Sequence, residues 1–591
     1  MILHRTALAW LVTITVTTAS AAIPEQPHPR ILFPKRLETA VRSRVDSDPV
    51  AAQLLAAILK RSDEILRERT CRYEIPDGKR LLSESRRALL NITHTSMAWR
   101  LTGDDKYRLR SIAELDAACA LKNWNTKHFL DTAEMAAAVA IGYDWLHHTL
   151  TPEQRGRYED ALIAKALRPA KAVHDSKGWW SRPRNNWSQV CGAGIGLAAA
   201  AVWDRDPDLC ESLFKSSVDL VASCGRFYHP DGCYPEGPSY WHYGTNFHIL
   251  MLAACQALGE PAPIDPTLQR SGEFILQITG PTGYDYNFAD AGSRRASITS
   301  AQSWIATQFK DPQQCRAVRT AVAKDPERAA DGRLSALHLL WLPSPPTGPA
   351  PALRTAARFG GEQPVAFLRT GWSADDAWLA IKGGTGAASH GHLDAGSFIY
   401  EALGVRWCVD LGSDNYNMPG YFGSKRWSYF RLNNRSHNTL VIDEQLQAAP
   451  KEPCPITASG AEGSRQWLTI DLGLAYPKQA DAVTRRAVFD ASTGETVIED
   501  TIRNPAGPVR WAIVTDARIT IEGRRVILEN AGKRIHLTRK DASGGEWTRT
   551  PATPPTTREK QNEGYQILAF TAPKARKLHL QVSLTPMPVD R

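Results

Sequence analysis

The sequence offers little cysteine chemistry. Its ten cysteines are scattered between Cys71 and Cys454, and no two of them form a CxxC pair. This spacing argues against a zinc site made of thiolates and against a small domain stapled by disulfides. One or two bridges would still suit an oxidising compartment, but their pairing does not follow from the sequence.

Long apolar runs and dense basic tracts are also missing. No segment is long and uncharged enough to span a bilayer. Residues 1–22 combine Arg5, a short apolar stretch at 7–16 and small residues at 19–22, which predicts a signal peptide and a periplasmic or secreted protein. The net charge of +9 suits an acidic polysaccharide, DNA or an anionic surface, and a generally basic exported protein explains it equally well. Because no Lys/Arg tract is interleaved with aromatic residues, nucleic acid is the weaker choice of partner.

Two periodicities divide the remaining chain. Over residues 23–342 apolar side chains recur at helical spacing, and many helices of this length favour a stacked or toroidal array over a four-helix bundle. A Pro-rich stretch, LPSPPTGPAP, then predicts a linker over 343–363. Over 364–591 the pattern changes to period two, which predicts an antiparallel β-sandwich with room for a small C-terminal β subdomain. We therefore expect a multidomain α + β protein.

The segment SHGHLD at residues 389–394 carries the strongest chemical signal. Its two histidines are separated by one glycine, and Asp410 and a further histidine, His437 in the segment SHNT, follow downstream. Histidine and carboxylate side chains suit Zn²⁺. His392, Asp410 and His437 are the candidate zinc ligands, with a mainly structural role for the metal, and His390 is left free as an acid or base. Hydrogen-bonded structural histidines are the competing interpretation.

Two aromatic segments lie in the helical half. The first, WWSRPRNNWSQ at 179–189, combines indoles that can stack on sugar rings with Arg and Asn side chains that can hold a carboxylate, although a loop buried between helices would have a similar composition. The second, DGCYPEGPSYWHYG at 231–244, contains three tyrosines, of which Tyr240 is the candidate catalytic one. The candidate substrate-binding residues are Trp124, Trp180, Arg182, Arg184, Asn185, Glu236, Tyr243 and Arg435.

The order and spacing of these motifs resemble those of the heparinase II/III-like polysaccharide lyases. The resemblance rests on NNW at 185–187, EGPSY at 236–240, SHGHLD at 389–394 and SHNT at 436–439, with further similarity at FLDTAEM, residues 129–135. It implies an (α/α) toroid followed by an antiparallel β-sandwich, with the active site in the cleft between them. One position departs from the pattern, because some members have a histidine where this chain has Trp187. Neutralisation of the substrate carboxylate would then depend on Asn186, helped by Asn185 or an arginine.

The implied reaction is β-elimination on a uronic-acid-containing glycan. Asn186 would stabilise the charge that develops on the carboxylate, while Tyr240 would protonate the leaving oxygen at C4. Tyr240 would also serve as the base in a syn elimination, and His390 would serve for the opposite stereochemistry. Three rivals stay open: a glycoside hydrolase using two of Asp144, Asp231 and Glu236, a non-catalytic glycan-binding protein, and a zinc hydrolase. The sequence does not distinguish heparan, alginate or another uronate as the substrate.

Overall fold

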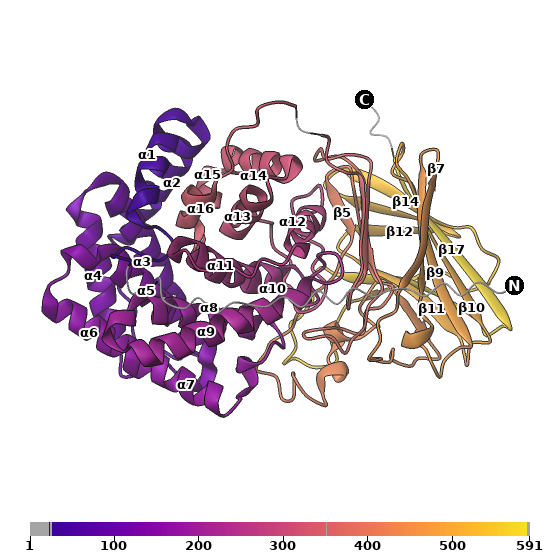
Figure 1. Ribbon diagram of the computed structural model, residues 1–591. Coiled ribbons are helices and arrows are strands. Elements are labelled where there is room, and N and C mark those ends of the chain that lie inside the picture. The colour runs from indigo at the N-terminus through magenta and orange to yellow at the C-terminus, as the bar shows by residue number, and fades with distance from the viewer. Residues whose placement is uncertain (1–22, 24–25, 350, 588–591) are drawn as a thin grey trace, which may run out of the picture.

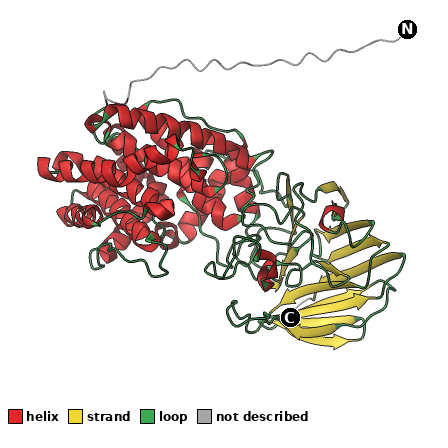
Figure 2. Ribbon diagram, turned by 90° about the horizontal axis from the view of Figure 1, so that it is seen from below, coloured by secondary structure: helices red, strands yellow, loops and turns green. Residues whose placement is uncertain are grey.

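The computed structural model describes residues 23, 26–349 and 351–587, so the predicted signal peptide lies outside the described residues. Helices fill the N-terminal part and strands the C-terminal part, and the two lie against each other (Figures 1 and 2). None of the described helices is both long and apolar enough to cross a membrane. The helices are α1 (Lys35–Ser47), α2 (Pro49–Ile65), α3 (Leu82–Thr102), α4 (Asp105–Ala120), α5 (Phe129–Leu146), α6 (Pro152–Leu162), α7 (Arg168–Asp175), α8 (Asn186–Ala201), α9 (Pro207–Cys224), α10 (Pro238–Tyr240), α11 (Asn246–Leu258), α12 (Thr267–Gln277), α13 (Ser300–Phe309), α14 (Pro312–Lys324), α15 (Pro326–Ala330) and α16 (His338–Trp341).

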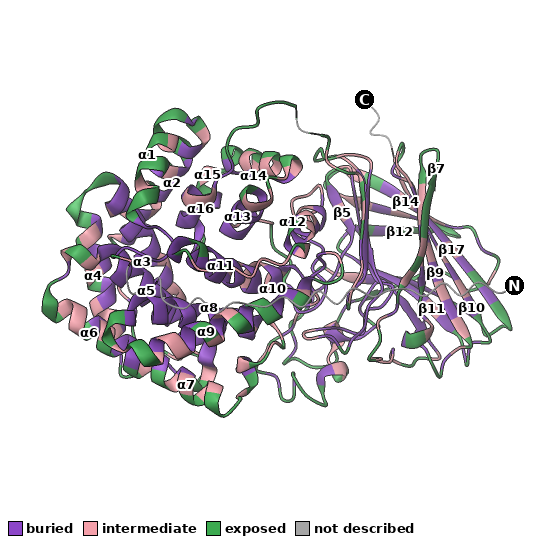
Figure 3. Ribbon diagram, viewed as in Figure 1, coloured by how far each residue is buried: buried purple, intermediate pink, exposed green. Residues whose placement is uncertain are grey.

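The innermost helices of the array are α5 and α8. Every residue of α5 is buried, and α8 is buried almost throughout (Figure 3). They approach closely because Gly194 has no side chain: a Cβ there would lie 2.3 Å from the carbonyl oxygen of Ala133. Helices α3, α9 and α11 pack around this pair. The glycine and alanine residues of these helices therefore bring the backbones together at the centre of the helical part.

Three antiparallel sheets form the C-terminal part. One contains five strands, ordered β1-β2-β3-β4-β5, one contains eight, ordered β12-β13-β14-β17-β10-β9-β8-β7, and one contains four, ordered β15-β16-β11-β6. The strands are β1 (Ala356–Phe359), β2 (Val365–Arg369), β3 (Trp378–Lys382), β4 (Phe398–Ala402), β5 (Val405–Cys408), β6 (Leu440–Ile442), β7 (Ile456–Glu462), β8 (Arg465–Asp471), β9 (Ala482–Asp490), β10 (Thr496–Arg503), β11 (Val509–Thr515), β12 (Arg518–Glu522), β13 (Arg525–Asn530), β14 (Lys533–Arg539), β15 (Thr548–Pro551), β16 (Gln566–Ala572) and β17 (Lys577–Pro586). The predicted fold class, a helical toroid followed by an antiparallel β-sandwich, is confirmed.

The five-stranded sheet joins the two parts of the molecule. Its strands β2, β3 and β4 are buried on both faces. Phe367, Trp378 and Ile399 point into the helical core, while their neighbours Leu368 and Leu379 belong to the core of the sandwich. Because successive side chains of a strand point to opposite faces, one sheet serves both cores. The loop between β3 and β4, which carries His390, is thereby held at the junction.

A buried ion pair anchors this loop from inside the sandwich. The Arg485 guanidinium on β9 donates from Nε and Nη2 to the Asp500 carboxylate on β10, at 2.7 and 2.9 Å, and both side chains are fully buried. Its Nη1 also donates to the carbonyl oxygens of Gly396 and Asn438. These two residues end the segments that carry His392 and His437, so the pair links the sheet to both histidine loops.

We expect Asp500→Ala to lower the free energy of unfolding by about 3–5 kcal/mol, because it leaves the Arg485 charge buried without a counterion. Urea denaturation measures this loss. The control is Glu499→Gln, which removes the neighbouring Arg486–Glu499 pair, whose arginine is 41% exposed. That pair should contribute less than about 1 kcal/mol. Equal losses in the two variants would contradict the special role of the buried pair.

Candidate active site

Tyr240 and His390 meet at the junction of the helical part and the sandwich. Tyr240 ends the short helix α10, which Gly237 introduces with φ +79°; a Cβ on Gly237 would lie 2.6 Å from the Phe288 carbonyl oxygen. The Tyr240 ring stacks on the His390 imidazole with 4.0 Å between the ring centroids. Its hydroxyl lies 2.6 Å from that of Tyr416, in the loop between β5 and β6. Burial raises the pKa of Tyr240, which keeps this phenol protonated.

Asp290 holds the His390 ring in place. Its Oδ2 lies 2.8 Å from His390 Nδ1, so a neutral imidazole donates from Nδ1 and keeps Nε2 as its basic nitrogen. The backbone at His390 has φ +61°, a conformation that non-glycine residues seldom adopt. Strained backbone of this kind is concentrated at functional sites, where the surrounding contacts maintain it. The imidazole is therefore fixed by the carboxylate on one side and by the stacked phenol on the other.

Sequence reasoning missed Asp290. The other oxygen of its carboxylate, Oδ1, accepts hydrogen bonds from His392 Nε2 at 3.0 Å, from the Tyr421 hydroxyl at 2.8 Å and from Arg426 Nη2 at 3.1 Å. These groups all come from the sandwich, whereas Asp290 lies in the loop that follows α12 of the helical part. Although burial alone would raise the pKa of Asp290, His390, His392 and Arg426 hold it well below the usual value for a carboxyl group. Asp290 is therefore an anion shared by both parts of the molecule.

Asn186 and Glu236 lie behind Tyr240 as a closely paired set. Asn186 starts α8, and its Nδ2 and backbone N donate to the two Glu236 carboxylate oxygens at 2.5 and 3.1 Å. Both residues are buried, and burial raises the pKa of Glu236. The Asn186 Oδ1 has no hydrogen-bond partner among the described residues. The predicted neutralising amide is thus close to the catalytic candidates, but its donor faces Glu236.

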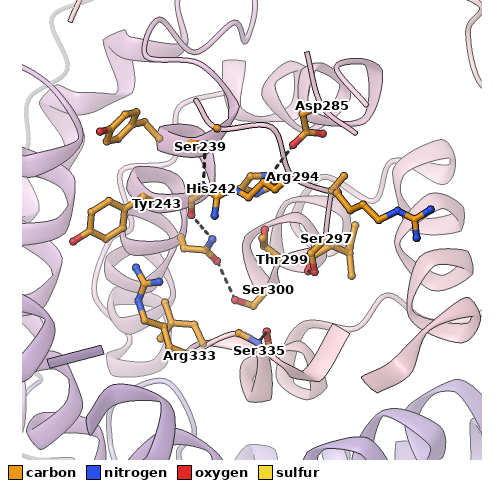
Figure 4. Close-up of a pocket in the computed structure, with 18 of the residues that line it drawn as sticks. Ser239, His242, Tyr243, Asp285, Arg294, Ser297, Thr299, Ser300, Arg333 and Ser335 are labelled. Atoms are coloured by element: carbon orange, nitrogen blue, oxygen red, sulfur yellow. Dashed lines mark hydrogen bonds and ion pairs between the residues drawn. The ribbon is translucent and has the colours of Figure 1, made fainter. Parts of the chain in front are cut away.

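A cavity of about 570 Å³ opens beside Tyr240. Figure 4 shows Tyr243 and Arg333 on one side of it and Ser297 and Thr299 on the other. Hydroxyl groups line much of the wall, and its charged members are Arg86, Asp285, Asp290, Arg294, Arg295 and Arg333. Four cations against two anions suit a ligand that carries negative charge and many hydroxyl groups.

The three candidate zinc ligands lie close together in the core. His437 Nδ1 lies 3.0 Å from Asp410 Oδ2, and the rings of His392 and His437 have their centroids 5.4 Å apart. His392 Nδ1 and His437 Nε2 are buried with no hydrogen-bond partner in the described part of the chain. Among the described residues, no group of three or more His, Cys, Asp or Glu side chains could hold a metal ion in this conformation. Zinc therefore stays a prediction, supported by two unpaired imidazole nitrogens.

Several predicted substrate contacts have other roles. Trp124 and Trp180 are 0% and 2% exposed and pack in the helical core, so they cannot stack on a sugar in this conformation. Asn185 caps α8 by accepting from the backbone N of Trp187. Arg182, Arg184 and Arg435 are exposed and do not line the cavity. Of the predicted contacts, Tyr243 lines the cavity and Glu236 lies directly behind the site.

Comparison with known proteins agrees with this architecture. Residues 361–582 match the family model described as Heparinase II/III-like, C-terminal. No curated protein matches the chain in sequence. The fold resembles a solved heparinase III, with 15% identity, a TM-score of 0.61 and coverage of 87% of this chain and 79% of that one. It also resembles heparan sulfate lyase HepC from Pedobacter heparinus, with 14% identity, a TM-score of 0.56 and coverage of 95% and 92%.

The chain combines a helical toroid with an antiparallel sandwich and carries a His-Gly-His loop at the junction of the two parts. The family model covers the sandwich, and the solved structures share the fold of nearly the whole chain. The C-terminal part of the chain is therefore similar to the heparinase II/III-like family, in line with the resemblance of the sequence motifs, and the fold of nearly the whole chain is similar to that of the two solved structures.

Proposed function

We propose that the protein is a polysaccharide lyase that cleaves a uronic-acid-containing glycan by β-elimination. The observation that carries this proposal is the stack of Tyr240 on His390, with Asp290 behind the imidazole and an arginine-lined cavity beside the phenol. The similar solved structures include a heparinase III and a heparan sulfate lyase, which supports the same class of reaction for this chain.

In the proposed reaction the two rings divide the proton transfers. His390 Nε2 takes the C5 proton of the uronate, and the electron pair of that bond forms the C4–C5 double bond. The bond from C4 to the glycosidic oxygen breaks, and Tyr240 gives that oxygen a proton. The raised pKa keeps the Tyr240 phenol in its protonated form, so Tyr240 is present as a proton donor and not as a phenolate base. This favours His390 as the base over a Tyr240 that serves as both base and acid.

Asn186 and Glu236 are proposed to bind the uronate carboxylate. Asn186 Nδ2 is committed to Glu236, so it contacts the substrate only if the ligand shares or replaces that hydrogen bond. The raised pKa of Glu236 favours its neutral form, which can donate a hydrogen bond to an incoming carboxylate. Such donors stabilise the charge that develops as C5 loses its proton.

A screen of purified protein against uronic-acid polysaccharides, followed by ultraviolet absorbance, tests the proposal. A lyase creates an unsaturated uronate that absorbs in the ultraviolet. A glycoside hydrolase and a zinc hydrolase would release sugars without that absorbance, and a binding protein would release nothing. The hydrolase candidate Asp144 is fully buried and accepts hydrogen bonds from the backbone N of Arg30 and of Ile31, so it is not available as an acid or base.

We also propose that the protein is exported to the periplasm or outside the cell. A further proposal is that zinc binds at His392, Asp410 and His437. When bound, zinc would fix the loop that carries His390. Elemental analysis of purified protein should show about one zinc per chain, and His392→Ala should lower both the zinc content and the melting temperature. Wild-type protein that is free of zinc after purification without chelators would remove the metal from the proposal.

A further inference from the structure

Two arginines from distant parts of the sequence meet at one buried carboxylate in the cavity. Arg86 lies on α3, Arg333 precedes α16, and Glu134 lies on the inner helix α5. The Nε of Arg86 is 3.0 Å from Glu134 Oε1, and the Nε of Arg333 is 2.7 Å from Glu134 Oε2. Both guanidinium carbons lie about 5 Å from the centre of the Tyr243 ring, at 4.9 and 5.1 Å. Three separate elements thus fix the position of both cations.

The charges of this cluster do not cancel. One carboxylate faces two guanidinium groups, which leaves one positive charge in excess at the cavity wall. Burial alone would raise the pKa of Glu134, but Arg333 and Arg86 hold it below its usual value, so the carboxylate stays ionised. The Arg86 and Arg333 side chains are 40% and 27% exposed, while that of Glu134 is fully buried. The excess charge is therefore presented to the cavity.

The orientation of the two guanidinium groups favours an oxyanion ligand. Arg86 donates to Glu134 Oε1 from its Nε, and Arg333 donates to the same oxygen from its Nη2 at 3.3 Å. Both Nη groups of Arg86 and the Nη1 group of Arg333 therefore remain for another acceptor. Arginine edges of this kind bind carboxylate and sulfate oxygens in pairs. A neutral sugar hydroxyl would not compensate the excess charge, whereas an anionic group would.

The cluster lies one helical turn from the catalytic candidate. Tyr243 follows Tyr240 by three residues in the continuous helical segment formed by α10 and the π-helical turn Trp241–Thr245. Three residues advance a helix by roughly 4.5 Å, and both tyrosines line the same cavity. A saccharide that places one ring at Tyr240 would place a neighbouring ring near Tyr243.

We propose that Arg86 and Arg333, positioned by Glu134, form an anion subsite that binds the carboxylate or sulfate group of the sugar next to the one that is cleaved. Its place in substrate recognition rests on the proposed function. The subsite makes the enzyme selective for glycans with negative charge on two adjacent rings.

Binding of small anions tests the subsite without requiring turnover. The probes are D-glucuronate, D-glucose 6-sulfate and neutral D-glucose, titrated into wild-type protein and into Arg86→Gln and Arg333→Gln, with binding followed by NMR. The control is Arg87→Gln, which removes a positive charge from the next residue of α3, where Arg87 pairs with Glu68 away from the cavity. We expect each cavity variant to bind at least one anion about 10- to 100-fold more weakly, and Arg87→Gln to bind as the wild type does.

The two anionic probes identify the chemistry of the ligand. Selective loss of glucuronate binding supports a carboxylate subsite, and selective loss of sulfate binding supports a sulfate subsite. If a Gln variant does not fold, the Lys variant at that position takes its place. The affinity of the Lys variant for the anion should fall at least threefold, because the ammonium of lysine is a point charge and lacks the planar guanidinium group of arginine. Wild-type affinity for both anions in the cavity variants, or equal binding of glucose, overturns the proposal.

The anion-binding experiment tests the subsite independently of the proposed β-elimination. Arginine-dependent anion binding by a protein that gives no ultraviolet-absorbing product would refute the lyase proposal and leave the subsite standing. A lyase whose cavity variants bind both anions as the wild type does would refute the subsite alone.

Discussion

Tyr240→Phe is expected to reduce kcat by about 10²- to 10⁴-fold, the usual contribution of a positioned acid or base. The substitution removes the hydroxyl that would protonate the leaving oxygen, but it keeps the ring that stacks on His390. KM should therefore change by no more than a few-fold, because the cavity and its arginines are unaltered. The loss is one of transition-state stabilisation, not of substrate binding.

Initial rates over a range of substrate concentrations, followed by ultraviolet absorbance, separate kcat from KM. Tyr73→Phe is the control, since it also removes one phenol oxygen, from a side chain that bonds Asn123 outside the cavity. That variant should retain wild-type kinetics. A Tyr240→Phe enzyme with a near-normal kcat would exclude Tyr240 as the proton donor and would leave His390 without its proposed partner.

The fold class followed from the sequence because helices and strands leave different apolar periods. The helical spacing of apolar residues and the Pro-rich stretch separated the two halves. The sequence did not predict that β2, β3 and β4 are buried on both faces. A run such as VAFLR at 365–369 shows that a strand is apolar, but it does not show that one face meets a helical core and the other a sandwich core.

Candidate site residues could be chosen from the sequence where they lay in short motifs. His390 and Tyr240 come from segments with unusual composition, and the structure stacks them. Trp124 and Trp180 were wrong as sugar contacts, because an indole suits a buried core as well as a sugar-binding surface and the sequence alone does not report burial. Asp290 gave no local signal, since its partner His390 is 100 residues away along the chain.

The same reasoning explains why the arginine cluster was missed. Arg86, Glu134 and Arg333 stand in three separate segments, none of which resembles a binding motif. Only the packing of α3 and α5 and the return of the chain before α16 bring them together. Charges whose function depends on such packing are recognisable from their geometry and not from their spacing.

Asp290→Asn is expected to impair both the reaction and the fold. The amide nitrogen of asparagine would face His390, His392, Tyr421 or Arg426, each of which now donates to the carboxylate. Arg426 is 9% exposed, and it would lose its buried counterion. Since removal of one partner from a buried ion pair costs about 3–5 kcal/mol, we expect a loss of about 3 kcal/mol in the free energy of unfolding.

The kinetic effect should be at least about 100-fold in kcat, because the His390 ring would lose the acceptor that keeps its proton on Nδ1. Urea denaturation and ultraviolet kinetics on the same preparation measure the two effects.

The matched control is Asp231→Asn. Asp231 also connects the helical part to the sandwich, by accepting from the backbone N of Gly360, but an asparagine oxygen can still accept that bond. The Asp231→Asn variant should lose at most about 1 kcal/mol in its free energy of unfolding and should keep its activity. If Asp290→Asn lost stability but kept its kcat, the carboxylate would join the two parts of the molecule without orienting the base, and His390 would owe its position to the Tyr240 stack and its own backbone.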